Sequence, residues 1–320
     1  MATELTAARY GKTKVRVFRI VREGSWHNIV EYNVEALVEG DIATSYTEAD
    51  NSVVVATDSI KNITYCLSLH ISSIAERFAL HLGTFLVSKY AHLSKAFVTV
   101  EQLRWTRIHV AGEASPEGHP HSFYRDGDDK RVVNAVVDAT GGKDKLVATV
   151  TSGVADLLVL KSTGSGFTNF YRDEYTTLVE VDDRIFSTSV DLTYTFAPLR
   201  IAAPTDEKKL EFVMPLQKGE GGYAGSVWDE EVPGRARAAT LETFAVDESA
   251  SVQATLYKMG QRIIAENASV TSVSYSLPNK HYVPVDMKYI GVDNLTPSKA
   301  EVFTPIAAPS GLIKATISRT

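Results

Sequence analysis

The segment from residue 184 to 196 constrains the fold of this chain most strongly, because its residues alternate strictly between two faces. One face collects Phe186, Thr188, Val190, Leu192, Tyr194 and Phe196. The other collects Ser187, Ser189, Asp191, Thr193 and Thr195. A period of two is typical of a β-strand with one packed and one polar face. The chain is therefore expected to build a sheet that is covered on one side.

Other segments repeat this strand signal and add two helical patterns. Strands are expected at 14–22, 28–40, 146–160, 185–196, 270–277 and 283–290, the first two joined by a hairpin at "EGSWH". A helix is expected at about 74–92, with Ser73 and Glu76 spaced as a capping box. A second helical segment runs from about Ala236 to Asn267 and is expected to break near Asp247. Its apolar stripe consists of Val252, Leu256, Met259 and Ile263.

The order of these segments predicts an α+β fold. Strands, a helix and strands fill residues 1–140, and a similar order fills 141–320, with a charged, glycine-containing surface insertion near 198–235. Helices grouped between antiparallel hairpins cover one face of a sheet. A broad sheet also needs a partner for its other face, so we expect an oligomer.

Composition excludes several classes of function. The chain has 320 residues and a net charge of −6, and its basic residues are scattered, so nucleic-acid binding is not expected. No apolar run approaches the ~18 residues that favour a membrane span. The N-terminus lacks a secretory pattern, and the C-terminal "ISRT" is not the peroxisomal tripeptide "SKL". A cytoplasmic location is the expectation.

Familiar single motifs do not account for the chain. "KSTGSGF" lacks the residue order of a phosphate-binding loop, and no G-x-G-x-x-G follows a strand. His119 and His121 in "HPH" form half of a metal site at most, because no third ligand lies at a spacing that is typical of metal sites. A solvent-exposed loop is the preferred interpretation there, and no metal site is predicted.

What remains is a set of separated polar stretches that border strands and helices. They contain Lys12, Thr57 with Asp58, Arg184, Gln253, and the "SLPNKHY" segment with Asn279 and His281. Each alone is better interpreted as a cap, a turn or a surface patch. Thr57 and Asp58 suit the start of a short helix, and Gln253 suits a solvent-exposed helix position. Their occurrence together calls for a second hypothesis.

The segments resemble the urate oxidase (uricase) family, in family order over nearly the whole chain. They are "YGKTKVRV", "SYTEADNSVVVATDSIKN", "LLVLKSTGS", "RDEYTTL", "DRIFSTSVD", "SASVQAT", "SLPNKHY" and "GLIKATISR". The resemblance implies two tandem tunnelling-fold units, each an antiparallel four-stranded sheet with helices on one face. It also implies a homotetramer in which subunits close their sheets into a barrel.

The family reaction is oxidation of urate by O2 and water to 5-hydroxyisourate and hydrogen peroxide, in purine degradation, without a metal or organic cofactor. The resemblance assigns Arg184 and Gln253 to the edge of urate and Phe167 to its face. A guanidinium donates through a planar fork, and an amide offers a donor beside an acceptor. Backbone N–H groups near Asp58 and Val252 are implied to complete the recognition.

The resemblance also implies a proton relay. Lys12 lies beside Thr57, His281 is linked to the lysine, and Asn279 holds O2 or water above the ring. Lys280 then points elsewhere if the segment is extended. Active sites are expected at subunit interfaces, with Lys12, Thr57 and Asp58 supplied by the neighbouring subunit.

Two features depart from the family pattern. The 198–235 segment is longer and richer in glycine than expected, and Pro284 replaces a residue that is more commonly large and apolar. Proline lacks the N–H for a ladder bond, so Pro284 is expected at an edge or a non-bonded site. The alternative function is an inactive purine- or pterin-binding tunnelling-fold protein; the related pterin and GTP enzymes use a metal site or a differently placed acid.

Overall fold

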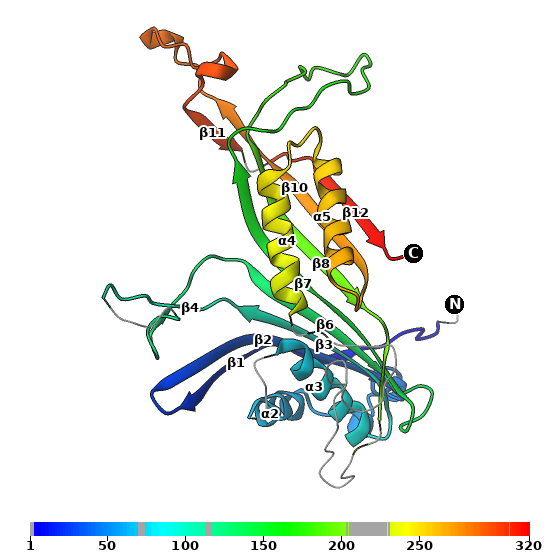
Figure 1. Cartoon of the computed structure of the whole chain (residues 1–320). Coiled ribbons are helices and arrows are strands. Elements are labelled where there is room, and N and C mark those ends of the chain that lie inside the picture. The colour runs from blue at the N-terminus through cyan, green and yellow to red at the C-terminus, as the bar shows by residue number, and fades with distance from the viewer. Residues whose placement is uncertain are drawn as a thin grey trace. The chain divides into compact units, whose positions relative to one another are not determined.

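Figure 1 shows a computed structural model of the chain, which describes residues 3–69, 74–112, 117–202, 204, 229, 231–306 and 308–320. The chain forms two compact units. The first contains Met1–Gly153 and Thr195–Glu230, and the second contains Val154–Tyr194 and Glu231–Thr320. The architecture is α+β with extensive antiparallel strand pairing, as the sequence predicts.

The first unit is built on an antiparallel sheet. Its strands are β1 (Tyr10–Glu23), β2 (Trp26–Gly40), β3 (Leu93–Leu103) and β6 (Lys130–Asp138), paired in that order. The start of β7 (Leu146–Lys161) pairs with β9 (Leu199–Ile201). A separate small sheet consists of β4 (Thr106–Arg107) and β5 (Phe123–Tyr124). The predicted β1–β2 hairpin is confirmed, and its strands meet at Glu23 and Trp26.

Four helical segments follow β2 among the described residues of this unit. They are α1 (Ala43–Thr47), the 3₁₀ turn η1 (Asn51–Val53), α2 (Thr57–Ser68) and α3 (Ala75–Lys89). The longer two, α2 and α3, pack against this sheet. The prediction of a helix at about 74–92 is confirmed by α3. Ser73 of the expected capping box lies outside the described residues, while Glu76 is fully buried and bonded to Arg131 and Ser152. Buried residues alternate along β2, and the Tyr32 ring stacks on Phe78 of α3 at 5.7 Å.

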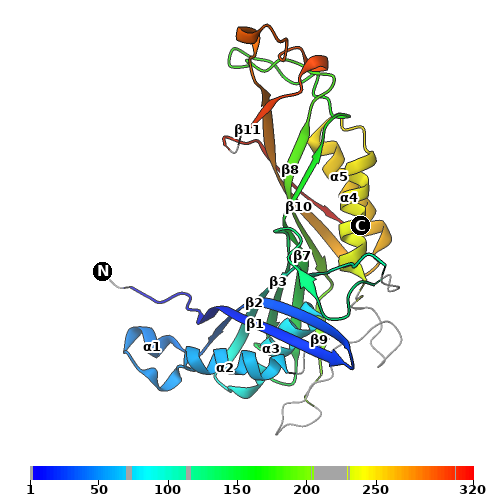
Figure 2. The same cartoon turned by 90° about the vertical axis from the view of Figure 1, so that its left-hand side faces the viewer.

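The second unit has the same plan, with strands on one side and two helices on the other (Figures 1 and 2). Its strands are the end of β7, β8 (Phe186–Phe196), β10 (Val270–Pro284), β11 (Phe303–Ile306) and β12 (Leu312–Ser318). β10 pairs with β12 over Ser272–Pro278 and with β11 over His281–Pro284. The helices are α4 (Val232–Val246) and α5 (Val252–Glu266), so the predicted break near Asp247 is confirmed.

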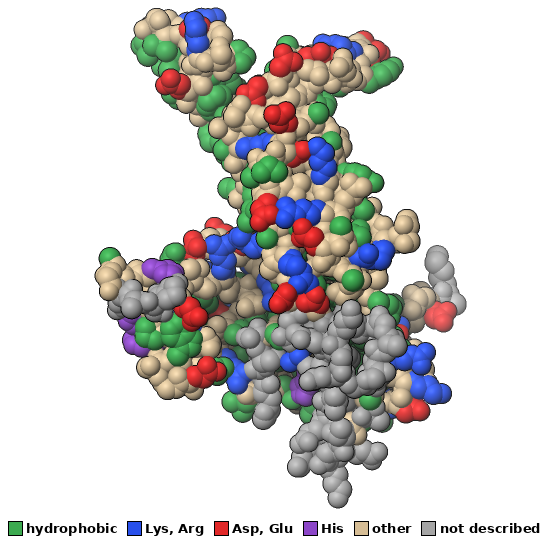
Figure 3. Space-filling view, viewed as in Figure 1, with side chains coloured by type: hydrophobic (Ala, Val, Ile, Leu, Met, Phe, Trp, Pro, Cys, Tyr) green, Lys and Arg blue, Asp and Glu red, His purple; other side chains and the backbone are tan. Residues whose placement is uncertain are grey.

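Alternation along β8 explains how the helices are held. The apolar face predicted from the sequence is buried from Phe186 to Phe196, and the Phe186 ring lies 5.0 Å from that of Phe244 in α4. The Tyr275 hydroxyl of β10 lies 2.6 Å from Thr240 of α4. The outer surface of α4 and α5 carries acidic and basic side chains next to one another (Figure 3). These helices therefore bury one apolar face and expose a charged one.

The prediction of a strand at 283–290 is wrong. β10 continues to Pro284, and Lys288–Ile290 forms a 3₁₀ turn, η2, whose Lys288 N–H donates to the Asp286 carboxylate at 2.9 Å. A second 3₁₀ turn, η3, spans Pro297–Lys299. Pro284 lies opposite Phe303, next to a residue whose N–H bonds to Val302. Because bonded and non-bonded pairs alternate in an antiparallel ladder, Pro284 occupies the non-bonded site expected for it.

Much of the predicted 198–235 surface insertion lies outside the described residues. Its described ends are β9 and the first turn of α4. No helix among the described residues is long and apolar enough to cross a membrane.

Candidate active site

Lys12 lies on β1 beside an irregularity of the strand. It pairs with Ala36, and the register of β1 shifts between Lys12 and Val15. A Cβ atom on the preceding Gly11 would lie 2.0 Å from the Ala36 carbonyl oxygen, a distance that no side chain tolerates. Only glycine allows the two backbones to approach this closely. Gly11 therefore fixes the path of the chain that presents Lys12.

Thr57 and Asp58 form the first turn of α2, as the sequence favoured. The chain just before α2 is tied to β1, because the Val55 N–H donates to the Tyr10 hydroxyl at 2.7 Å. No side chain caps Ala56 before the helix, so the first amides of α2 keep their donor capacity. Such helix N-termini favour anionic groups.

Charge links these residues to Lys12. A hydrogen bond from Lys61, 2.5 Å from Asp58, lowers the pKa of that carboxyl, and the charge of Lys12 adds to the effect. Lys12, Thr57 and Asp58 thus lie in one region of the first unit, on β1 and on the helix tied to it.

Phe167 and Arg184 are held together in the second unit. The Phe167 backbone exchanges two hydrogen bonds with Val181, at 2.8 and 3.1 Å. Arg184 donates its backbone N–H to Ser165 at 2.7 Å, and its guanidinium carbon lies 5.2 Å from the centre of the Phe167 ring. Burial lowers the pKa of Arg184, which stays charged because a guanidinium does not deprotonate in proteins. A flat ring and a planar donor fork thus share one surface.

Val252 and Gln253 open α5. The Ser251 hydroxyl caps the helix by accepting the Ala254 N–H at 3.1 Å. Val252 is buried, and Gln253 is exposed. The cap holds the helix start so that the Val252 amide and the Gln253 side chain come from one fixed turn.

Asn279 and His281 lie where β10 changes partner from β12 to β11. The Asn279 N–H donates to Gly311 at 2.7 Å, and His281 pairs with Ile306. Because successive strand residues face opposite sides, Asn279 and His281 share a face, while Lys280 takes the other.

Arg184 and His281 also line one cavity of about 700 Å³, together with apolar residues such as Val181, Tyr282 and Phe303. This volume lies within the range of small-molecule sites. Phe167, Val252, Gln253 and Asn279 belong to the same unit but do not line the described part of that cavity. Lys12, Thr57 and Asp58 belong to the other unit.

Sequence reasoning missed the residue that organises the Phe167 loop, the segment of residues 162–167 that follows β7. The Asp183 carboxylate accepts from the Thr163 hydroxyl at 2.6 Å and from the N–H groups of Gly164 and Ser165 at 2.7 and 3.3 Å. The bond from Thr163 is the main reason that the pKa of Asp183 lies below its ordinary value. Its position directly before Arg184 in "DDRIF" was the available signal.

The histidine pair considered as half of a metal site does lie on one side of the chain. The His119 and His121 rings meet edge to face at 4.5 Å, and His27 lies 5.8 Å from His121. Within the described part of the chain, no three His, Cys, Asp or Glu residues are grouped so that they could hold a metal ion.

Comparison with known proteins supports one family. The family model described as "Uricase" matches residues 8–136 and 150–314. The chain is 43% identical to "Uricase" of Aspergillus flavus, over 98% of this chain and 96% of that one, and 32% identical to "Uricase" of Arthrobacter globiformis, over 97% and 88%. The crystal structure of uricase from Arthrobacter globiformis superposes with a TM-score of 0.81 at 30% identity, covering 100% of this chain and 96% of that one. The chain belongs to the uricase family.

Proposed function

We propose that this protein oxidises urate with O2 and water to 5-hydroxyisourate and hydrogen peroxide, as a step of purine degradation. The observation that carries this proposal is the extent of the family match, because residues 8–136 and 150–314 include every candidate site residue. The alternative function, an inactive purine- or pterin-binding protein, is not favoured, because the relatives of this chain are named as uricases.

The second unit supplies most of the substrate contacts in this proposal. Urate is a flat anion edged with carbonyl and N–H groups, so it suits a planar guanidinium beside an aromatic face. Arg184 donates to one edge, Phe167 stacks on the ring, and Gln253 pairs with a donor and an acceptor of the opposite edge. Backbone N–H groups near Asp58 and Val252 complete the edge. The 5.2 Å contact between Arg184 and Phe167 supports this arrangement.

The chemistry then moves two electrons and several protons. Urate gives two electrons to O2, which becomes hydrogen peroxide, and water supplies the new hydroxyl group at C5. A Thr57 hydroxyl alone is too weak a base, so Lys12 activates it and His281 passes protons at ambient pH. Asn279 holds O2 or water above the ring. Neither a metal nor an organic cofactor takes part in the proposed reaction.

The protein works as a homotetramer in this proposal, with Lys12, Thr57 and Asp58 donated to each site by a neighbouring subunit. Strand edges support it: within the described residues, β1 pairs only with β2, and β12 pairs only with β10. On β7, Leu158 and Leu160 are 63% and 48% exposed on the face opposite to buried Leu157 and Val159. Edge pairing between subunits would close the sheets into a barrel and cover such residues. A cytoplasmic location stays a prediction.

The test follows urate absorbance, O2 uptake and peroxide together on purified protein treated with a strong chelator. Loss of urate with matching O2 uptake and peroxide is the expected result. Urate that binds but is not consumed would favour the inactive alternative. Activity that disappears only with the chelator would contradict the cofactor-free mechanism.

A further inference from the structure

The short linker between α4 and α5, residues 247–251, connects the two substrate-binding parts of the second unit. At one end it leads into Val252 and Gln253. In its middle, the Ser249 N–H donates to Gly164 and the Ser249 carbonyl accepts from Gly166, both at 2.9 Å. These bonds join the linker to the loop that carries Phe167. Any movement of the linker would therefore change the spacing between the α5 N-terminus and that loop.

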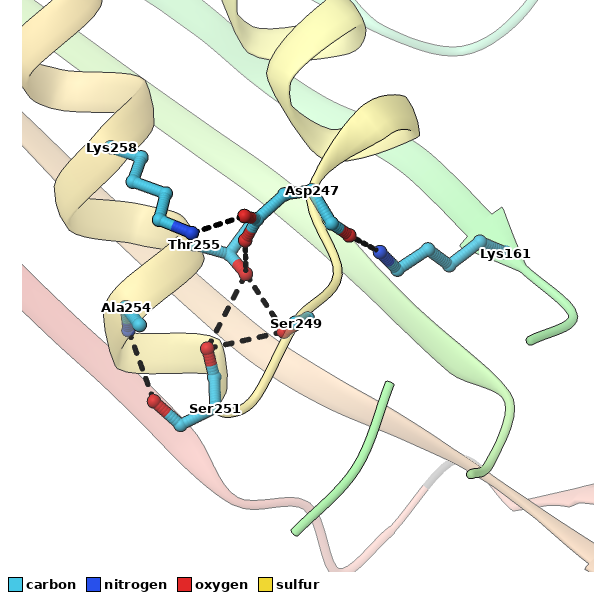
Figure 4. Close-up of polar contacts among 7 residues, drawn as sticks. All are labelled: Lys161, Asp247, Ser249, Ser251, Ala254, Thr255 and Lys258. Carbon is cyan, nitrogen blue, oxygen red and sulfur yellow. Dashed lines mark hydrogen bonds and ion pairs between the residues drawn. The ribbon is translucent and has the colours of Figure 1, made fainter. Parts of the chain in front are cut away.

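Asp247 anchors the linker at the end of α4 (Figure 4). Its side chain is only 8% exposed. One carboxylate oxygen accepts from the Thr255 hydroxyl at 2.7 Å, and the other pairs with Lys258. The Asp247 carbonyl accepts from Lys161 at the end of β7. Helix α4, helix α5 and the sheet of this unit thus converge on one residue.

The charge state of Asp247 fits this role. Burial alone would raise the pKa of the carboxyl, but the bonds from Lys258 and Thr255 more than offset burial, so that the pKa lies below its ordinary value. Asp247 is therefore ionised at neutral pH and accepts from both partners.

Thr255 carries the constraint from Asp247 to the linker. Its hydroxyl oxygen lies 2.7 Å from both Asp247 and the Ser249 hydroxyl. The Ser249 hydroxyl in turn lies 3.1 Å from the carbonyl of Ser251, the residue whose side chain caps α5 (Figure 4). Because Thr255 is fully buried, water cannot replace its hydroxyl in this chain of bonds.

We propose that Asp247 and Thr255 are positioning residues that fix the start of α5 against the Phe167 loop and thereby set the affinity for urate. The inference rests on the proposed function, since urate is the molecule that spans the two parts. Neither residue belongs to the proposed proton relay. Loss of the network should therefore weaken binding more than it slows turnover.

The test compares Thr255→Val with Thr240→Val. Both replacements remove a fully buried hydroxyl from a helix of the second unit and keep the side-chain shape, but Thr240 bonds to Tyr275 and Ala236, away from the linker. The measurements are the Kd for urate without O2, kcat and KM with O2, the Tm, and hydrogen exchange at the Gly166 amide. Thr255→Ser restores the hydroxyl as a rescue.

Thr255→Val is expected to raise Kd and KM about 10-fold, because it removes the buried hydroxyl that links Asp247 to the linker. The kcat should stay within about 2-fold, since the relay groups are untouched. Exchange at Gly166 should become faster, and Thr255→Ser should reverse both effects. Thr240→Val should lower the Tm without changing Kd or that exchange.

Equal Kd values for Thr255→Val, Thr240→Val and the wild type would overturn the inference and leave a merely structural role. If Thr255→Val fails to fold, Asp247→Asn serves instead, because it keeps the shape and removes the charge. The same pattern of raised Kd with retained kcat is expected of it, and an unchanged Kd overturns the inference. A wild type that neither binds nor oxidises urate would overturn the proposed function itself.

Discussion

The two groups of candidate residues are held in opposite ways. In the second unit, Phe167 is bonded to Val181 in both directions, and the neighbouring loop is held by the carboxylate of Asp183. In the first unit, Thr57 starts a helix without a side-chain cap, and Asp58 is exposed. A preformed binding surface avoids an ordering cost on binding, whereas a group that passes protons must come within hydrogen-bond reach of the proton that it transfers. Under the proposed mechanism, the preformed surface around Phe167 and Arg184 sets the affinity, and Lys12 and Thr57 of the first unit act with His281 on the rate.

Thr57→Ala is expected to have the largest effect, and that effect falls on kcat. It removes the hydroxyl of the relay and leaves the binding surface of the second unit intact. We expect kcat to fall about 10²–10⁴-fold, the usual range for a general acid or base, with KM changed far less. Urate absorbance under saturating O2 measures both constants. Thr47→Ala is the control, because Thr47 is an exposed helical threonine of the same unit, and its hydroxyl donates to the Ala43 carbonyl in the same helix. A raised KM with normal kcat would assign Thr57 to binding instead.

Arg184→Gln should have the opposite effect, raising KM more than it lowers kcat. The guanidinium is half-buried, and its loss leaves an anionic substrate without its charge partner. We expect KM to rise about 10²–10³-fold, since truncating one member of a buried charged pair costs about 2–5 kcal/mol. Arg172→Gln is matched to it, because Arg172 lies at the same 5.2 Å from an aromatic ring, Phe170, but is exposed. An equal effect of both substitutions would show that net charge, and not the site, is responsible.

Mixing these two variants tests whether the groups meet between subunits. Each homomeric variant carries one defect in every site. Suppose that Thr57→Ala chains and Arg184→Gln chains assemble at random. About a quarter of the interface sites then combine an unmutated Thr57 from an Arg184→Gln chain with an unmutated Arg184 from a Thr57→Ala chain. Activity should therefore recover to about a quarter of that of the wild type after co-expression. Recovery would be absent if each site were built from a single chain.

The sequence predicted the framework better than the site. The alternation over Phe186–Phe196 and the break at Asp247 could be predicted, because a strand face and a helix end depend on residues that are close together in the sequence. The prediction of a strand at 283–290 failed because the chain turns after Pro284, where the Asp286 carboxylate accepts the Lys288 N–H, and an apolar pattern does not reveal such a turn. β12 was missed because its residues are mostly exposed and alternate weakly.

The candidate site could be found only through the resemblance. Lys12 and Thr57 are far apart in the chain, and the Tyr10–Val55 bond that ties their segments together has no local signature. Asp183 accepts from two backbone N–H groups and a hydroxyl that lie 18 to 20 residues earlier in the chain, so its position next to Arg184 marks it as a candidate but does not reveal its partners. Contacts of this kind depend on the completed fold.

The smallest expected effect concerns how the Phe167 loop responds to acid. The folded pKa of Asp183 is lowered from 3.8, first by the bond from Thr163. Its stabilising contribution is therefore complete above about pH 4 and is lost as the pH falls through the lower, folded pKa. Asp183→Asn should thus be slightly less stable than the wild type at neutral pH, by at most about 2 °C in Tm.

That gap in Tm should close below pH 4, where the wild-type carboxyl takes up its proton. Thermal unfolding at several pH values measures the gap, and the neighbouring exposed Asp182→Asn serves as the control. A gap that stays constant with pH would mean that shape, not charge, holds the loop. Closure of the gap for Asp183→Asn, and not for Asp182→Asn, would instead show that an ionised carboxylate helps to preform the binding surface of the second unit. The exposed start of α2 has no comparable side-chain cap.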